Sequence, residues 1–501
     1  MPRLLKSACF AALALAGCLL LAASPAAAAT PNLEVDGNRI RDVKTGNEFI
    51  PRGVNWPSFE YACVQGWGYA NEGANPDTAQ AMLDWNINTV RIPLNQDCWL
   101  GDDGLPDNEE YPEPPDLTAT GYRDAVGDFV DDLTDAGLVV VLDLHWTGQD
   151  GTVADGLRPM ADNRSDDFWA SAANRFKTND AVIFDLFNEP HSRWDPVAHD
   201  WAFLQSWSCW RGGGCEAPDQ ADTDLPVTGA KYTTVGMGTL LAAVRGTGAS
   251  QPVILSGLDY ANDLSKWSER APADDQLIAG FHNYPGQDCD DAACWVGEIE
   301  TVAAEHPVIT AEFGQSDCQA DHIERYMKWA DVRGIGYLAW AWWVLPEEGC
   351  TNYALITDLN GTPTPTYGAH FREHLEDPAT PPDDQPPEIL PELPRPANRA
   401  DAGLKIVSAK VRGGQLKARL KVRPIAGKPV SARIEFFRGK KKRKISLKVK
   451  IRRGIGTIKR KLPPKAKPHR LVARYPGDKL LLPDKTRFSL KSSRHARPPA
   501  P

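Results

Sequence analysis

The chain has 501 residues, of which 42% are hydrophobic, so it has room for at least one large core and for more than one domain. Its formal net charge of −10 conceals a division, because residues 401–501 hold 32 basic and only 4 acidic residues. This asymmetry indicates two domains with different surroundings. Basic charge alone gives salt-sensitive, sequence-blind binding, so we expect no specific nucleic-acid recognition.

Residues 1–29 have the pattern of a signal peptide. Arg3 and Lys6 precede an apolar stretch over residues 8–23, and small residues follow at 26–29. Cys18 ends a Leu-Ala-Gly-Cys sequence that also resembles a lipoprotein box, but apolar residues continue beyond it, which favours secretion over lipid anchoring. No other segment has the ~20 apolar residues of a transmembrane helix. The mature protein is therefore predicted to be extracellular.

After the signal, residues 32–48 contain two short strand-like runs, which predict a hairpin lid. Apolar runs of strand length then alternate with helical patterns. The predicted strands occupy residues 49–56, 89–94, 138–145, 182–187, 253–257, 277–284, 307–314 and 336–344. The predicted helices occupy residues 77–85, 121–136, 166–177, 229–245, 295–305, 321–332 and 367–375. Eight strands that alternate with helices predict an α/β fold, a (β/α)8 TIM barrel over residues 30–376.

The remainder of the chain has a different composition. Proline and acidic residues dominate residues 377–400, as in an extended linker. Apolar and basic residues then alternate with period two in five segments of residues 401–490, which predicts a small all-β sandwich. Within it, Arg474-Tyr475-Pro476-Gly477-Asp478 resembles a segment near the end of bacterial Ig-like repeat domains, which implies an Ig-like fold. Residues 491–501 are predicted to be a disordered tail.

Cysteine usage agrees with export. Eight cysteines remain after the signal is removed, and an even number in an exported chain indicates disulfides. Short spacings favour two local pairs and leave two longer bridges, although sequence alone does not fix the connectivity. The candidate pairs are Cys209/Cys215, Cys289/Cys294, Cys63/Cys98 and Cys318/Cys350. No Cys-x-x-Cys spacing occurs, so a zinc site is disfavoured.

Two buried strands end in glutamates. The apolar run over residues 182–187 stops at Asn188-Glu189-Pro190, where the proline cannot continue a central strand. The run over residues 307–314 contains Glu312 near its end. The C-terminal ends of parallel barrel strands are where active sites are built. Two carboxylates there are the minimal equipment for cleaving a glycosidic bond.

Further motifs occur in order at the ends of the other predicted strands. They are Arg52-Gly53-Val54-Asn55, Asn88-Thr89-Val90-Arg91, Leu144-His145, His282-Asn283-Tyr284, Ala311-Glu312-Phe313-Gly314 and Trp340-Ala341-Trp342. With the Asn-Glu-Pro segment, they make residues 32–376 resemble glycoside hydrolase family 5, the cellulase family of (β/α)8 retaining β-glycosidases. The resemblance implies that Glu189 is the acid/base and Glu312 the nucleophile.

Roles for the remaining polar site residues follow from this resemblance and from the needs of a retaining mechanism. Arg91 is expected to hold Glu312 ionised, and Tyr284 to donate a hydrogen bond to it. Asn188 is expected to bind the sugar 2-hydroxyl. Each assignment has a purely structural alternative, namely a buried ion pair for the arginine and an ordinary buried hydrogen bond for the tyrosine.

Histidines and tryptophans complete the predicted site. His145 and His282 are expected to orient hydroxyls or the two carboxyls, with a hydrogen-bonded core histidine as the alternative. Trp342 or Trp340 is expected to form an apolar floor under the sugar. Strand alternation places both on one face, so the choice between them is open.

The sequence thus predicts a secreted retaining glycosidase, and specifically a cellulase-like endo-β-1,4-glucanase that acts on polysaccharide as a monomer without metal or cofactor. A β-mannanase, a β-1,3-glucanase and an exo-β-glucosidase remain alternatives, because loops set specificity. A non-catalytic glycan-binding wall protein is disfavoured by the presence of both glutamates. The basic cluster over Lys440–Lys444 either contacts an anionic cell-wall polymer or is a solvated turn without a partner.

Overall fold

The computed structural model describes residues 30–378, except 72, 102–116, 150–152, 222–225, 228, 318 and 345–352, and seven strands between residues 405 and 489. The chain divides into two compact units, Met1–Asp384 and Gln385–Pro501. This division falls within the predicted linker, and the exact domain limits stay predictions. The predicted signal, most of the linker, the tail and the Cys318/Cys350 pair lie outside the described residues.

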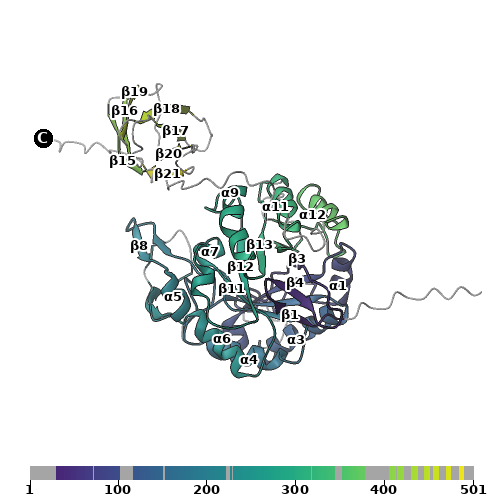
Figure 1. The fold of residues 1–501 in the computed structure, drawn as a ribbon. Coiled ribbons are helices and arrows are strands. Elements are labelled where there is room, and N and C mark those ends of the chain that lie inside the picture. Colours follow the sequence, from purple (N-terminus) through teal and green to yellow (C-terminus); the bar gives the residue numbers. More distant parts are fainter. Residues whose placement is uncertain are drawn as a thin grey trace, which may run out of the picture. The chain divides into compact units, whose positions relative to one another are not determined.

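Eight parallel strands close into a barrel in the first unit (Figure 1). Their bounds are β3 (Arg52–Asn55), β4 (Thr89–Asn95), β5 (Val139–Trp146), β6 (Val182–Asp185), β11 (Val253–Ser256), β12 (Leu277–Asn283), β13 (Val308–Phe313) and β14 (Gly336–Ala339). The order around the barrel is β11-β12-β13-β14-β3-β4-β5-β6. Nearly every strand residue is buried, which explains the continuous apolar runs of the sequence. The predicted TIM barrel is confirmed.

Helices surround the barrel, and most of them bury one face against it (Figure 1). They are α1 (Pro76–Leu83), α2 (Gln96–Leu100), α3 (Ala119–Asp135), α4 (Ser165–Phe176), α5 (Trp207–Gly212), α6 (Met237–Gly246), α7 (Leu258–Ala261), α8 (Trp267–Arg270), α9 (Ala292–Cys294), α10 (Glu300–Ala303), α11 (Asp321–Asp331) and α12 (Tyr367–Glu376). A π-helical turn, η1 (Trp295–Ile299), lies between α9 and α10. Capping residues in the sequence fix where some of these helices begin. Asn75 caps α1, which begins with proline, and Thr118 caps α3.

Two helix predictions need correction. The pattern over residues 229–245 begins too early, because Lys231–Thr233 forms strand β10 and pairs with β9 (Glu216–Pro218). The helix itself starts at Met237, where the apolar spacing of Leu240, Leu241 and Val244 faces the core. The predicted helix over residues 295–305 is divided between the π turn and α10. In both places a helix does form, but its ends differ from those that the apolar periodicity predicts.

The N-terminal hairpin does not cover the predicted site. Strands β1 (Leu33–Asp36) and β2 (Arg39–Asp42) pair in an antiparallel manner. The amide of Leu33 donates to the carbonyl of Asp180, just before β6 begins, and that of Val35 donates to Gln276, just before β12. Leu33 and Ile40 pack on residues near the strand starts, such as Val139. The hairpin therefore closes the N-terminal end of the barrel, away from the mouth where the glutamates lie, and it is not a lid over the site.

Long connections at the mouth carry the disulfides. Three of the predicted pairs are confirmed, namely Cys63–Cys98, Cys209–Cys215 and Cys289–Cys294. The first joins the loop after β3 to α2, which follows β4. The connection after β6 contains an extra hairpin of strands β7 (Arg193–Asp195) and β8 (Asp200–Phe203). Among the described residues, no helix is long and apolar enough to cross a membrane.

The second unit consists of seven antiparallel strands in two sheets. One sheet has the order β15 (Lys405–Arg412), β16 (Gln415–Lys421), β19 (Ile455–Lys461). The other has the order β18 (Ile445–Ile451), β17 (Val430–Phe437), β20 (Arg470–Tyr475), β21 (Asp484–Ser489). The five segments predicted from alternation each overlap a strand, whereas β19 and β21 were missed. Its Ig-like character stays a prediction.

A glycine in β3 allows the close approach of β4. A Cβ built on Gly53 would lie 1.7 Å from the carbonyl oxygen of Thr89, whereas a Cβ on Gly246, at the end of α6, meets nothing within 4 Å. We expect Gly53→Ala to lower the free energy of unfolding by about 3 kcal/mol or more, because neighbouring strand backbone must move. The matched Gly246→Ala should be neutral or stabilising by about 0.5 kcal/mol. Urea unfolding of both variants tests this, and equal stabilities would contradict the backbone register.

Candidate active site

Arg91, in the middle of β4, lies at the centre of the predicted site and is fully buried. Its Nε donates to Asp185 at 2.9 Å, and its Nη1 donates to Glu312 at 2.8 Å. Further partners are Asn55 on Nη1 at 2.9 Å, Asn188 on Nη2 at 2.7 Å and Asp143 on Nη2 at 3.0 Å. These five partners come from β3, β5, β6, the segment after β6, and β13. One planar cation therefore ties together side chains from strands around the barrel.

Three carboxyl groups surround this single cation. Burial raises the pKa of Asp143 to about 7 against the opposing effect of Arg91. Burial also raises the pKa of Asp185 well above its usual range. Burial acts to lower the pKa of Arg91, but the carboxylates of Asp143, Asp185 and Glu312 outweigh it and raise that pKa. A proton on one of the aspartic acids therefore reduces the excess of negative charge, while the guanidinium stays charged and bonded to Glu312.

The second oxygen of Glu312 is held from the other side. The hydroxyl of Tyr284 donates to Glu312 Oε2 at 2.8 Å. Burial, reinforced by the charges of Glu312 and Glu189, raises the pKa of Tyr284 well above its usual range, so the phenol keeps the proton that it donates. Both oxygens of Glu312 thus accept hydrogen bonds from fixed donors, the arrangement that suits a carboxylate.

Glu189 faces Glu312 across His282. His282 Nδ1 lies 2.9 Å from Glu189 Oε1 and 3.6 Å from Glu312 Oε2. One ligand atom of each of these three residues lies within 4.8 Å of the others. Retaining glycosidases separate their carboxyl groups by ~5–5.5 Å, whereas inverting enzymes need ~6.5–9.5 Å to admit a water. The observed closeness matches the retaining arrangement. Such a trio has the chemistry of a metal site, but the adjacent charge of Arg91 disfavours a cation.

Both histidines are neutral near pH 7. Burial lowers the pKa of His145 to about 4 and that of His282 to about 3. His145 Nδ1 lies 2.6 Å from Asp143, and its ring stacks on Trp340 with centroids 5.6 Å apart and planes 11° apart. Asp143 therefore connects Arg91 to His145, and His145 supports the indole of Trp340.

The two candidate floor tryptophans lie in different places. Trp340 contacts His145, whereas Trp342 is only 3% exposed and packs edge-on against Trp85 at 4.8 Å. The expectation that strand alternation puts both rings on one face is wrong, because β14 ends at Ala339 and the chain then leaves the sheet. Trp340 is therefore the ring that lies beside His145, which in turn is bonded to Asp143.

Trp342 instead lines an adjacent cavity of about 720 Å³. The loops after β3 and β14 form this cavity, with lining residues that include Trp56, Tyr61, Asn71, Trp342, Trp343 and Asp358. Trp343 packs edge-on against Trp340 at 6.2 Å, which joins the cavity to the site. Aromatic walls with a few polar groups are typical of small-molecule and sugar sites.

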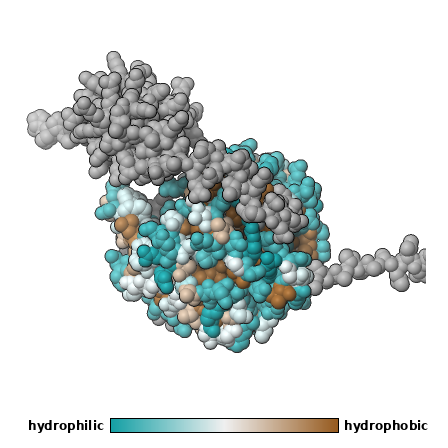
Figure 2. Space-filling model, viewed as in Figure 1, coloured by the Kyte–Doolittle hydropathy of each residue, from teal (hydrophilic) through white to brown (hydrophobic). Residues whose placement is uncertain are grey.

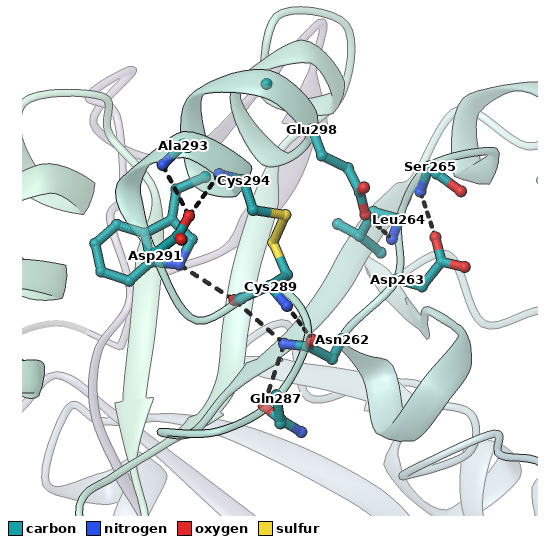
Figure 3. Close-up of a disulfide and its surroundings, with 12 residues drawn as sticks. Asn262, Asp263, Leu264, Ser265, Gln287, Cys289, Asp291, Ala293, Cys294 and Glu298 are labelled. Carbon is teal, nitrogen blue, oxygen red and sulfur yellow. Dashed lines mark hydrogen bonds between the residues drawn. A yellow bond between two sulfur atoms is a disulfide. The ribbon is translucent and has the colours of Figure 1, made fainter. Parts of the chain in front are cut away.

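Asn262 and the Cys289–Cys294 disulfide hold the segment that follows β12 (Figure 3), and this segment begins directly after His282 and Asn283 and carries Tyr284. Asn262, at the end of α7, donates to the carbonyl of His282 at 2.8 Å and to Gln287 Oε1 at 3.1 Å. Gln287 Oε1 also accepts from the amide of Tyr284 at 2.7 Å. The amide of Cys289 donates to Asn262 at 2.7 Å, and its disulfide to Cys294 tethers the loop to α9. One buried amide side chain therefore positions two predicted site residues.

Sequence reasoning missed several of these residues. Asp143 and Asp185 are each the one charged residue inside an otherwise apolar strand, and they are register partners in β5 and β6. A charge in the middle of a buried apolar run is the signal that could have found them, because buried charges are rare unless paired. Glu60, in the loop after β3, was also missed. It is buried, it accepts from the amide of Ser58 at 2.7 Å, and burial raises its pKa to about 8, with smaller contributions from Asp143 and Glu312.

Two glutamates this close, one held by an arginine and the other beside a neutral histidine at the mouth of a TIM barrel, define the class of the glycoside hydrolases. The family model of cellulase (glycosyl hydrolase family 5) matches residues 44–345, more than half of the chain. The chain belongs to this family and is a glycoside hydrolase.

Matches to solved structures were also found. A β-glucanase from Saccharophagus degradans, solved in complex with cellotetraose, is 18% identical with a TM-score of 0.49, and the match covers 69% of this chain and 93% of that one. A hyperthermophilic endocellulase from the archaeon Pyrococcus horikoshii is 18% identical with a TM-score of 0.46, covering 70% of this chain and 100% of that one. A comparison with curated proteins found no match.

The buried carboxyl of Glu60 predicts a pH-dependent stability. Its pKa of about 8 exceeds the ordinary 4.5, so its contribution to stability is complete below pH 4.5 and is lost as the pH rises through 8. Glu60→Gln cannot ionise. The difference in unfolding free energy between the variant and the wild type should therefore grow in favour of the variant as the pH rises from 5 to 8. The total change should be a few kcal/mol, the free-energy equivalent of the pKa shift of Glu60.

Urea unfolding of both proteins across this range measures the difference. The pair at about pH 3 is the internal control, because Glu60 is then protonated in the folded and the unfolded wild type, and both proteins carry a neutral side chain at this position. A stability difference that does not change with pH would contradict the burial of a protonated Glu60.

Proposed function

We propose that this protein is a secreted retaining endo-β-1,4-glucanase in which Glu189 is the acid/base and Glu312 the nucleophile. The observation that carries the proposal is the pair of glutamates, with ligand oxygens within 4.8 Å, in different hydrogen-bonding environments. Arg91 and Tyr284 both donate to Glu312, as a nucleophilic carboxylate requires. Glu189 instead faces the neutral imidazole of His282, which brings no cation to oppose protonation of the acid.

The proposed reaction has two steps. Glu189 gives its proton to the glycosidic oxygen while Glu312 attacks the anomeric carbon, which breaks the bond to the leaving group and forms a covalent glycosyl ester. Glu189, now a carboxylate, takes a proton from water, and the water oxygen displaces Glu312 with a second inversion. The product then has the configuration of the substrate, and the acid/base has recovered its proton.

Other residues hold the sugar during these steps. The Oδ1 of Asn188 accepts from Arg91, which orients its Nδ2 to donate to the sugar 2-hydroxyl, a contact that strengthens in the transition state. Trp340, supported by His145, provides an apolar floor beneath the sugar ring. The cavity beside Trp343 is large enough to hold further sugar units of a polysaccharide, which favours a chain-cleaving enzyme.

The proposal also includes export of the enzyme from the cell and an Ig-like fold for the second unit. The signal-like residues 1–29 and three disulfides support an extracellular enzyme. The arrangement of seven antiparallel strands in sheets of three and four supports an Ig-like sandwich for the basic unit.

Reducing-sugar release from carboxymethylcellulose, barley β-glucan, mannan, xylan and laminarin tests this proposal. We expect activity on the β-1,4-linked glucans and the β anomer as the first product seen by NMR. Glu189→Ala and Glu312→Gln should each lower kcat by roughly 10³-fold or more on these polymers. The matched control is Glu305→Gln, an exposed glutamate, which should match the wild type.

Each contrary result has a definite meaning. Preference for mannan, laminarin or short glycosides would replace the glucanase assignment by one of the alternatives in the same family. Formation of the α anomer, or full activity in either site variant, would overturn the proposed mechanism.

A further inference from the structure

The β7–β8 hairpin begins four residues after Glu189, at the mouth of the barrel. Its base is well anchored. The amide of Gln205 donates to the hydroxyl of Ser192 at 2.9 Å, which ties the two ends of the hairpin together. Phe203 is buried against Ala217, Tyr232 and the Cys209–Cys215 disulfide. The hairpin is therefore a fixed extension of the segment that carries Glu189.

A β-bulge turns two tryptophans to the outside of this hairpin. Arg193 pairs with Phe203, but the next pair is Trp194 with Trp201, so Ala202 is an extra residue. Bulges re-aim side chains in this way. Arg193 and Phe203 are buried, whereas Trp194 is 40% and Trp201 48% exposed. Their rings lie edge to face with centroids 5.3 Å apart, so they form one continuous aromatic surface.

Large aromatic side chains exposed next to a binding site indicate a contact surface. Val197 and Leu204 of the same connection are also exposed, and Figure 2 shows hydrophobic residues at the left margin, where Figure 1 places β8. The exposed pair on the hairpin is directly cross-strand, so its rings are presented together and at low conformational cost. The two indole rings consequently form one defined surface and are not isolated exposed side chains.

The order of strands around the barrel indicates where this aromatic surface lies relative to the proposed substrate. The aromatic cavity lies between the loops after β3 and β14, and β14 is four strands away from β6 in the closed ring of eight. The β6 connection therefore lies across the mouth from the cavity. A chain that fills the cavity and passes between Glu189 and Glu312 leaves the site over the β6 connection. Glu189 itself serves the oxygen of the leaving group, which is the part of the chain on that side.

We propose that Trp194 and Trp201 form a docking surface for the leaving-group side of a β-glucan chain. The apolar C–H faces of pyranose rings pack on the two indoles, while the cavity beside Trp342 holds the other side of the chain. This inference rests on the proposed function. It adds that productive binding of a polymer depends on the β7–β8 hairpin in addition to the barrel mouth.

The test uses the full chain and measures binding separately from hydrolysis. Trp194→Ala/Trp201→Ala is made in the Glu312→Gln background, and binding to soluble barley β-glucan is measured by affinity gel electrophoresis. We expect the dissociation constant to rise on the order of tenfold, from the loss of two stacking contacts. The matched control, Val197→Ser/Leu204→Ser, removes exposed apolar but non-aromatic side chains and should change it less than about twofold.

Two further measurements make the result specific. Trp194→Phe/Trp201→Phe keeps aromatic rings and should retain most of the affinity, which separates stacking from damage to the hairpin. In the active enzyme, the loss of kcat/KM from the alanine exchanges should be larger on barley β-glucan than on an aryl cellobioside, whose leaving group is a single ring.

The contrary outcomes are distinct. Unchanged glucan binding in the alanine variant, or an equal loss in the serine control, would overturn the docking surface. So would a wild-type dimer that the alanine exchanges dissociate without altering glucan binding, because the surface would then serve a second copy of the chain. A wild type that hydrolyses no glucan but loses glucan affinity in the alanine variant would contradict the catalytic proposal and leave the docking surface supported.

Discussion

The hydrogen bonds of the Arg91 guanidinium join β4 to side chains of β3, β5, β6 and β13, and the geometry of the site depends on them. A buried cation is stable only when its charge and all its donors are matched. Here the matching groups are Asp143, Asp185 and Glu312, together with two asparagine oxygens. Removing the arginine would leave several carboxyls facing one another in a dry interior. The barrel supplies the rigidity, since Asn55 is the register partner of Arg91 and Asp143 that of Asp185 in neighbouring parallel strands.

The same network separates the two glutamates chemically. Glu312 lies between a permanent cation and a protonated phenol, whereas Glu189 lies beside a histidine that burial keeps neutral. Two carboxyls with different surroundings are what a retaining mechanism needs, because one must attack while the other delivers a proton. Supporting contacts lie further out. Asn262 holds the carbonyl of His282 in β12 and, through Gln287, the amide of Tyr284. Asp143 connects Arg91 to His145 and Trp340.

Much of this arrangement could be predicted from sequence, for a physical reason. A strand buried on both faces must be apolar along its length, so the eight strands of the barrel read as continuous runs, and the polar residues at their ends mark the mouth. Contacts between distant segments could not be predicted in this way. Trp342 leaves the sheet because β14 ends at Ala339, and the N-terminal hairpin packs on the barrel end away from the site. The bulge at Ala202, which exposes Trp194 and Trp201, likewise depends on register.

The most direct test of the central account is covalent trapping of the nucleophile. A 2-deoxy-2-fluoro-β-cellobioside with a good leaving group should form a stable ester, and peptide mass mapping should place it on Glu312. With Arg91→Lys, which keeps the charge but loses the forked donor geometry, we expect labelling to slow on the order of tenfold or more. A label on another residue would contradict the role of Glu312. Labelling of Arg91→Lys at the wild-type rate would show that the site does not depend on the guanidinium.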